Sequence, residues 1–274
     1  MRLVAAADPV CSKRSMVLLW EHPLSPYAQK VKIALAEKNV AFECRIPDFV
    51  SGQDPEFASA NPRLEVPALV DGETRVFDST IILEYVEERW PTPPLLPATP
   101  AERARVRMIE DLCDTYYEPI AWAAMEINVF RRATGELAEK LLARGRDQVA
   151  GVNAYLDRQL DDREWFNGAA FGWGDLAVVP FVHGAASTGN PPADGTRLAR
   201  WLERARARPS VAAAFAAASE SMQGFEMIPQ LVESGMFKRE YRDHRLEWMM
   251  RSGGTDIVLE GMRRGTIRFS TELA

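Results

Sequence analysis

The sequence predicts an α/β domain followed by an all-helical domain. Residues 16–90 alternate short apolar runs with helical patterns in the order β-α-β-α-β-β-α, whereas residues 101–222 show helical periodicity almost throughout. Residues 91–100 join these regions and are rich in proline, which the interior of a helix does not tolerate. We therefore expect this segment to be the linker between the two domains.

The composition limits the classes of function. Of the 274 residues, 47% are hydrophobic and 26% are charged, which suits a folded core with a soluble surface. The formal net charge of −6 argues against a general nucleic-acid binder, whose surface would be basic. The three cysteines form no C-x-x-C pair, so they indicate no disulfide framework and no metal site, and they favour a reducing compartment. No apolar run is long enough to cross a bilayer, so we expect a cytoplasmic protein.

The first predicted strand and helix flank a loop that contains prolines. Residues 1–15 are interpreted as a disordered extension, and Met16, an alternative start, opens the apolar run MVLLW, which predicts a buried strand. Pro26 opens a helical pattern and suits a first helical turn, where its missing N–H costs nothing. Ser25 therefore lies at the N-terminus of a helix that follows a buried strand. Free backbone N–H groups and the helix dipole favour an anion at such a place.

Three further strands complete the first domain. Phe42–Ile46 predicts the second strand and Val66–Val70 the third. Pro67 cannot donate a hydrogen bond to a strand ladder, so the third strand begins at this proline or lies at an edge of the sheet. Asp71-Gly72 predicts a hairpin turn into the fourth strand, Arg75–Phe77.

Helices account for the rest of the chain. The pair Asp78-Ser79 precedes an apolar periodic run, which indicates a helix N-cap. Pro119 is the expected break in the first long helix of the second domain. Residues 223–274 are polar, and we interpret them as a C-terminal extension with helical pieces at 230–236 and 238–250. The other expected helices span residues 101–132, 135–160, 172–186 (the most apolar, and therefore central), 198–207 and 210–222.

Three motifs, found in this order, resemble the cytosolic glutathione transferase superfamily over residues 16–222. They are His22–Val31 (HPLSPYAQKV), Asn61–Leu69 (NPRLEVPAL, close to N-P-x-G-x-V-P-x-L) and Asp78–Val86 (DSTIILEYV, close to E-S-x-x-I-x-x-Y-L). Phe171–Ala177 (FGWGDLA) is a weaker fourth, at the place of the family's S/T-x-x-D capping box. The resemblance implies a thioredoxin-like domain that binds glutathione and a helical domain that shapes a second, apolar pocket.

The resemblance gives Ser25 the catalytic place. In serine-type members of the family, the hydroxyl donates a hydrogen bond that stabilises the glutathione thiolate, and the helix N-terminus adds a favourable potential. A plain N-cap role is the alternative for Ser25, and the two roles are compatible. A serine cannot form the mixed disulfide of the cysteine-type thiol transferases, which disfavours disulfide exchange as the reaction.

The other two motifs imply the remainder of a glutathione site. In the family the proline that matches Pro67 is cis, and the backbone N–H and C=O of the preceding residue, here Val66, pair with the cysteinyl backbone of glutathione. Ser79 and its helix N-terminus match the site of the γ-glutamyl carboxylate, and Asp78 matches that of the α-amino group. The alternatives are a trans proline that starts an edge strand and residues that only cap a helix.

The helical domain offers candidates for the pocket of the second substrate. In this family the long helix after the linker faces the active site, and the candidates that it carries here are Tyr116, Tyr117, Trp122, Met125 and Phe130. A core stripe explains these residues equally well.

Two residues depart from the family pattern. Leu64 stands where the family has glycine, so we expect a reshaped loop before Pro67. Gly172 replaces the serine or threonine cap, which we expect to weaken that helix start by up to about 1 kcal/mol.

Together these features predict a glutathione transferase whose thiolate attacks an apolar or aromatic electrophile. The reaction would be conjugation, ether cleavage or dehalogenation, in detoxification or aromatic catabolism. The resemblance implies a homodimer with glutathione as co-substrate, without a metal, a nucleic acid or a membrane partner. Two alternatives stay open: a non-catalytic regulatory module of this fold, and a carrier of hydrophobic ligands. The extension after residue 222 would fold over the active-site mouth or the dimer face.

Overall fold

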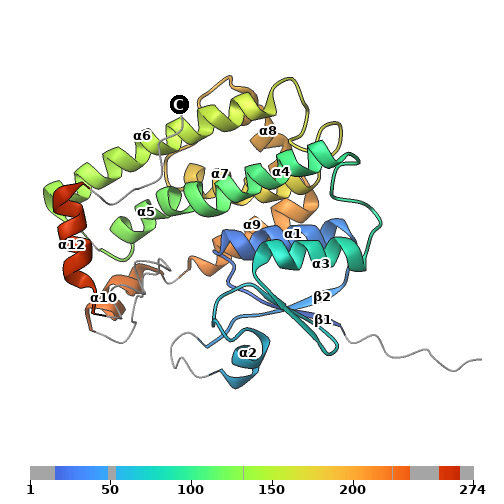
Figure 1. The fold of residues 1–274 in the computed structure, drawn as a ribbon, viewed down its shortest axis with the longest axis horizontal. Helices are drawn as coiled ribbons and strands as arrows, with labels where there is room; N and C mark the ends of the chain where they lie inside the picture. Colours follow the sequence, from blue (N-terminus) through green and yellow to red (C-terminus); the bar gives the residue numbers. More distant parts are fainter. Residues whose placement is uncertain (1–15, 49–53, 132, 224, 235–252, 266–274) are drawn as a thin grey trace, which may run out of the picture. The chain divides into compact units, whose positions relative to one another are not determined.

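The chain divides into two compact units, Met1–Pro93 and Pro94–Ala274, and the division falls within the proline-rich segment. In the residues that the structure describes, the first unit is a four-stranded sheet with helices and the second unit is helical (Figure 1). The predicted fold class, an α/β thioredoxin-like domain and an all-helical domain, is therefore confirmed. The structure is a computed structural model, and it describes residues 16–48, 54–131, 133–223, 225–234 and 253–265.

The first unit has the elements β1 (Val17–Trp20), α1 (Pro26–Glu37), β2 (Phe42–Arg45), α2 (Pro55–Ala60), β3 (Ala68–Asp71), β4 (Thr74–Phe77) and α3 (Ser79–Arg89). The strand order in the sheet is β2-β1-β3-β4. β1 and β2 are parallel, so the chain must cross over between them, and α1 makes this connection. β3 begins directly after Pro67 and lies inside the sheet, antiparallel to both neighbours. Of the two expectations for this proline, the strand start is correct and the edge position is wrong.

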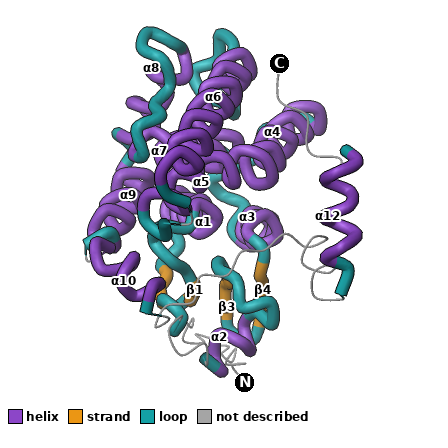
Figure 2. Tube along the Cα trace, turned by 90° about the vertical axis from the view of Figure 1, so that its left-hand side faces the viewer, coloured by secondary structure: helices purple, strands orange, loops and turns teal. Residues whose placement is uncertain are grey.

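The two faces of the sheet carry different helices. α1 and α3 lie over one face and α2 lies at the other (Figures 1 and 2). Leu18 and Trp20 pack in the cluster formed with Phe57 of α2, where the ring centroids of Trp20 and Phe57 are 5.4 Å apart. Val17 and Leu19 alternate with them and are buried on the opposite face. Burial on both faces explains why this strand is apolar at every position.

The second unit begins with α4 (Pro100–Leu112), the π-helical segment η1 (Cys113–Tyr117), α5 (Glu118–Asn128), α6 (Gly135–Leu160), α7 (Trp173–Ser187), α8 (Arg197–Arg206) and α9 (Pro209–Ser221). α7 packs against α4, α5 and α8. Every residue from Trp173 to Val182 is buried, so the predicted central helix is confirmed.

The first long helix of this unit is interrupted just before Pro119. This proline has no N–H to bond the carbonyl of Thr115, and its ring crowds that carbonyl. The wider turn of η1 accommodates both effects, because the N–H of Glu118 donates to the carbonyl of Cys113, five residues back. The break that we expected at Pro119 therefore takes the form of a π-helical turn on its N-terminal side.

The N-terminus of α7 corrects the expectation about Gly172. The N–H of Trp173 donates to the carbonyl of Leu95 (2.8 Å), and the N–H of Gly174 donates to Asn167 Oδ1 (3.4 Å). A Cβ atom at residue 172 would lie 2.2 Å from Asn167 Nδ2 and 2.4 Å from the Leu95 carbonyl oxygen. The glycine thus makes room for two groups that cap the helix from other parts of the chain, so we expect that the missing hydroxyl does not weaken the helix start.

The carboxylate of Asp175 completes this helix start. It is fully buried and accepts hydrogen bonds from four donors: the backbone N–H groups of Phe166 (2.8 Å), Asn167 (3.2 Å) and Gly172 (3.1 Å), and Nε1 of Trp201 (2.8 Å). Burial raises the pKa of Asp175 to about 6, while the four donors favour the ionised form. Asp175 therefore joins the loop before α7 to α8.

After residue 222 the described elements are η2 (Phe225–Met227), α10 (Ile228–Glu233) and α12 (Thr255–Arg264). The helical piece expected at 230–236 begins earlier, as α10, and the sequence did not predict α12. The piece expected at 238–250 and the extension 1–15 lie outside the described residues. Among the described helices, none combines the length and the apolar character that a membrane span needs.

Candidate functional site

Three loops leave the sheet of the first unit at the same end. The strand register places Trp20 opposite Ala68, and Ala68 opposite Phe77. Trp20 ends β1, Ala68 begins β3 and Phe77 ends β4. The segments after Trp20, before Ala68 and after Phe77 therefore emerge side by side. These segments carry the predicted residues Ser25, Val66, Pro67, Asp78 and Ser79.

Ser25 is the N-cap of α1. Its backbone is extended (φ −73°, ψ 115°), and its Oγ accepts a hydrogen bond from the N–H of Ala28 at 3.3 Å. Pro26 occupies the first helical turn, as its fixed φ favours. The side chain of Ser25 is half-buried, and its O–H proton is not used by the cap. The same hydroxyl can therefore cap the helix and donate to a ligand.

The loop that carries Ser25 is held by two side chains. Nδ1 of His22 accepts from the N–H of Leu24 (3.2 Å), and Nε2 of Gln29 donates to the carbonyl of Pro23 (2.7 Å). The carbonyl of His22 accepts from the N–H of Ser25 (2.8 Å). Burial lowers the pKa of His22, which keeps the imidazole neutral and able to accept at Nδ1. Sequence reasoning did not identify Gln29, because its partner is a backbone carbonyl.

The peptide bond between Val66 and Pro67 is cis, as the resemblance implied. A short hydrogen-bonded turn precedes it: Nδ2 of Asn61 donates to the carbonyl of Glu65 (2.6 Å), and Oδ1 of Asn61 accepts from the N–H of Arg63 (2.9 Å). Asn61 is almost fully buried, with an exposed fraction of 1%. This asparagine therefore fixes the loop that presents Val66.

Leu64 lies in the same turn with a left-handed backbone, at φ +55°. Its N–H donates to the carbonyl of Asn61 (3.0 Å), and its side chain is exposed. Leu64 thus adopts the left-handed backbone conformation that glycine favours. The strain of a left-handed leucine is about 1–2 kcal/mol.

Asp78 and Ser79 form the start of α3. Asp78 also has a positive φ (+71°), and its Oδ1 accepts from the N–H groups of Thr80 (3.1 Å) and Ile81 (3.3 Å). Asp78 is exposed, whereas Ser79 is buried. The cap uses one carboxylate oxygen of Asp78, so Oδ2 remains available to accept from a ligand.

Four of the predicted pocket residues of the second unit do not share one environment. Tyr117 lies in the core: its hydroxyl donates to Oδ1 of Asn153 (2.7 Å), and its ring stacks on Phe181. Burial raises the pKa of Tyr117. These contacts favour the core-stripe alternative for Tyr117. The other three, Tyr116, Trp122 and Met125, are half-buried.

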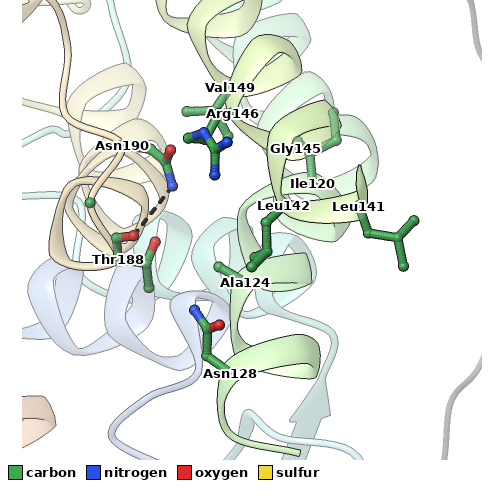
Figure 3. Close-up of a pocket in the computed structure, with 11 residues that line it drawn as sticks. Ile120, Ala124, Asn128, Leu141, Leu142, Gly145, Arg146, Val149, Thr188 and Asn190 are labelled. Atoms are coloured by element: carbon green, nitrogen blue, oxygen red, sulfur yellow. Dashed lines mark hydrogen bonds between the residues drawn. The ribbon is translucent and has the colours of Figure 1, made fainter. Parts of the chain in front are cut away.

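The second unit contains a cavity of about 220 Å³ that the sequence did not predict (Figure 3). Ile120, Ala124 and Asn128 of α5 line it, at the i, i+4, i+8 spacing of one helix face. Trp122 and Met125 are not among the lining residues. The other lining residues come from α6 (Leu141, Leu142, Gly145, Arg146 and Val149) and from the end of α7 and the turn after it (Thr188, Gly189 and Asn190).

Comparison with known proteins identifies the family. Residues 19–94 match the family described as the glutathione S-transferase N-terminal domain, and residues 139–204 match the glutathione S-transferase C-terminal domain. Glutathione S-transferase F10 of Arabidopsis thaliana is 32% identical over 172 residues, which cover 61% of this chain and 80% of that protein. The chain belongs to the glutathione S-transferase family. The expectation of a glutathione S-transferase is thereby confirmed at the level of the family.

The chain is also similar to a solved glutathione complex and to a stringent starvation protein. The rice protein GST1, solved in complex with glutathione, is 28% identical with a TM-score of 0.62, and the match covers 73% of this chain and 92% of that one. A stringent starvation protein A homolog of Coxiella burnetii is 39% identical over 97 residues, which cover 35% of this chain and 46% of that protein. This chain thus matches about half of the length of that relative.

Proposed function

We propose that the protein is a glutathione transferase that binds glutathione at the loop end of the sheet and uses Ser25 to stabilise the thiolate. The observation that carries this proposal is the strand register, which brings the loops of Ser25, Val66-Pro67 and Asp78-Ser79 out side by side. Glutathione is an elongated peptide with a carboxylate at each end, so it needs several such groups along one edge.

The central step is activation of the thiol, which is mostly protonated at neutral pH. The Ser25 hydroxyl would donate a hydrogen bond to the sulfur, while its oxygen still accepts the hydrogen bond from the N–H of Ala28. The thiolate would also lie near the N-terminus of α1, where the helix dipole favours negative charge. Both effects lower the pKa of the glutathione thiol and leave a nucleophile at neutral pH.

The other residues would bind the ends of glutathione. The backbone N–H and C=O of Val66 would pair with the cysteinyl residue, as one strand pairs with another. The N-terminus of α3, with Ser79, would bind the γ-glutamyl carboxylate. The carboxylate of Asp78 would accept from the α-amino group. Each of these groups is held by a hydrogen-bonded turn or cap, which favours a fixed geometry.

The acceptor in this proposal is an apolar or aromatic electrophile. Attack by the thiolate would result in conjugation, ether cleavage or dehalogenation. Tyr116, Trp122 and Met125 remain candidates to contact it, because they are half-buried. A cytoplasmic homodimer that takes part in detoxification or aromatic catabolism fits this role.

A second candidate function is a regulatory module without turnover. The 39% identity with a stringent starvation protein A homolog supports it. A carrier of hydrophobic ligands is a third. Both predict that glutathione does not form a thiolate at Ser25, whereas the transferase requires one.

The test compares wild type with Ser25→Ala, and with Thr196→Ala as a matched control. Thr196 caps α8 in the same way, with its Oγ1 accepting from the N–H of Ala199 at 3.2 Å. We expect wild type to bind glutathione and to show the short-wavelength ultraviolet absorbance of a thiolate. Ser25→Ala should keep binding, lose the thiolate, and lose about 10²-fold in kcat/KM with an activated aryl halide. Thr196→Ala should lose only stability. A wild type that does not bind glutathione would refute the transferase and favour the regulatory module.

A further inference from the structure

The cavity of the helical unit combines apolar walls with a single charged group. Ile120, Ala124, Leu142 and Val149 supply most of the apolar wall from α5 and α6. Among the residues that the structure describes, Arg146 is the one charged residue that lines the cavity, Asn128, Thr188 and Asn190 are polar, and none is acidic. Figure 3 shows its guanidinium extending between α6 and the segment of Thr188 and Asn190. A cation against apolar walls suits an amphipathic anion.

Arg146 has no protein partner in the described part of the chain. No hydrogen bond, ion pair or aromatic contact to its guanidinium is found among those residues, although many other arginines of this unit have one. Arg204 and Arg206, for example, bond the carbonyl of Glu164 and the ring of His183. A guanidinium carries five donors in a planar fork that matches a carboxylate in two parallel hydrogen bonds. Arg146 is exposed, so water solvates its donors in the free protein, and a ligand carboxylate can replace that water.

Asn190 lines the cavity together with Arg146 (Figure 3). Its Nδ2 donates to the carbonyl of Thr188 (3.4 Å), and its backbone N–H donates to the carbonyl of Ala185 (2.9 Å). These bonds hold the turn after α7, which carries Asn190 at the wall of the cavity. The cavity lining therefore combines polar groups from this turn with apolar side chains such as Leu142 and Ala124.

Gly145 keeps the cavity open on the α6 side. A Cβ atom built at this residue meets no atom within 4 Å, so close packing does not require the glycine. A glycine inside a helix costs about 1 kcal/mol relative to alanine. Its lack of a side chain leaves space next to Arg146, and it also offers a position from which the cavity can be filled by substitution.

We propose that this cavity binds a small apolar carboxylate, with its carboxylate on Arg146 and its apolar body against Ile120, Ala124 and Val149. The volume of about 220 Å³ corresponds to roughly seven non-hydrogen atoms, since one water molecule occupies about 30 Å³ in the liquid. Because the cavity is open to solvent, the end of a slightly longer chain can extend beyond it. The site goes beyond the proposed transferase function, because its residues belong to none of the predicted glutathione-binding elements. Its ligand therefore binds whether or not glutathione is present.

The experiment is calorimetric titration of the full-length protein with octanoate and, separately, with 1-octanol. Octanol has the same apolar body without the charge. We expect saturable binding of one octanoate per chain and at least tenfold weaker binding of octanol. Arg146→Gln should weaken octanoate about tenfold or more and leave octanol unchanged. Arg144→Gln, on the same helix but outside the cavity lining, is the control and should bind octanoate as wild type does.

A second pair of variants tests the location. Gly145→Leu fills the cavity and should abolish octanoate binding. Gly184→Leu is its matched control, because Gly184 is also inside a helix with open space at its Cβ but does not line the cavity. Circular dichroism shows that each variant is folded. The proposal is overturned if folded Arg146→Gln and Gly145→Leu both bind octanoate like wild type, or if no saturable binding is found. Ser25→Ala should keep octanoate binding, which separates this result from the fate of the transferase proposal.

Discussion

The two units use helix N-termini in opposite ways. At α7 of the helical unit, the buried carboxylate of Asp175 accepts from four donors, and the first N–H groups of the helix bond Leu95 and Asn167. At α1 and α3 of the first unit, Ser25 and Asp78 each accept only from their own first turn and retain part of their hydrogen-bonding capacity. The first arrangement is closed to ligands, and the second is open to them.

This difference shows that a polar residue before an apolar helix has no fixed meaning. The N-terminal N–H groups of a helix need partners in every case. Where the rest of the chain supplies the partners in the core, the helix start is part of the folding framework. Where the start lies at the surface, the same donors and the same dipole can bind an anion. The burial of the helix start decides which of these two roles it has, and this burial depends on segments that are distant in the sequence.

The largest expected effect sharpens this comparison with one substitution in each unit. Asp175→Asn puts an amide NH2 group where backbone N–H groups of Asn167 and Gly172 need an acceptor. We expect a loss of about 3–5 kcal/mol in the free energy of unfolding of the helical unit. Urea unfolding followed by circular dichroism measures it.

Asp78→Asn is the matched control. Asparagine retains Oδ1 for the two cap bonds and tolerates a positive φ, so the stability should change by less than about 0.5 kcal/mol. Glutathione affinity should nevertheless fall, because the charge that would face the α-amino group is lost. Equal losses of stability in the two variants would contradict the distinction between a closed and an open helix start.

The second prediction restores the residue that the family pattern contains. Gly172→Ser should destabilise the protein by about 2–3 kcal/mol, because the new Cβ would collide with Asn167 and with the Leu95 carbonyl. A serine at an ordinary N-cap position stabilises by about 1 kcal/mol instead. Thermal unfolding of the variant shows directly whether the substitution lowers or raises the melting temperature. A raised melting temperature would mean that Leu95 and Asn167 do not replace the cap.

The sequence predicted what local patterns determine, and failed where distant segments meet. Ser25, the cis bond at Pro67 and the α3 cap at Asp78 are set within a few residues, so motifs located them. The role of Gly172 depends on Leu95, 77 positions earlier in the chain. The cavity joins α5, α6 and the end of α7, and only tertiary packing brings these together. The sequence therefore pointed to Trp122 and Met125, which lie on another face of α5.

The third prediction concerns a half-buried histidine of the helical unit, His183, whose protonation changes with pH. Nδ1 of His183 accepts from Nε of Arg206 (3.1 Å), and its ring stacks on Phe215 with centroids 3.6 Å apart. Oγ of Ser187 lies 3.5 Å from its Nε2. Burial, and next the charge of Arg206, lower the pKa of His183 from 6.5 to about 4. Between these values the unfolded chain binds a proton that the folded chain does not, so stability falls as the pH decreases.

His183→Gln isolates this effect, since glutamine can accept from Arg206 but does not titrate near neutrality. Relative to the variant, wild type should lose about 1–2 kcal/mol between pH 7 and pH 4.5, after allowance for its partial exposure. Denaturation curves at several pH values measure the difference in the free energy of unfolding between the two proteins. Asp175 contributes to the pH dependence of stability with the opposite sign, but it is present in both proteins, so its contribution cancels in this difference. Parallel pH profiles for the two proteins would show that His183 is not held neutral by the fold.

The smallest predicted effect concerns strain in the first unit, where Leu64 and Asp78 both adopt positive φ beside the proposed glutathione edge. Leu64→Gly removes the strain of a left-handed leucine, about 1–2 kcal/mol. It also gives the unfolded chain more conformational freedom, which lowers the free energy of unfolding by roughly 0.5–1 kcal/mol. The exposed leucine side chain buries little surface, so we expect a net stabilisation of about 0.5–1 kcal/mol. Chemical denaturation measures this change in the free energy of unfolding. Leu137→Gly, at an exposed position inside a helix, is the control and should be destabilised by a similar amount. Glutathione affinity should stay within about twofold of wild type, because the turn keeps its hydrogen bonds to Asn61 whichever residue is present. A glycine variant that is less stable than wild type would show that the leucine side chain, and not the backbone conformation, determines the fold of this turn.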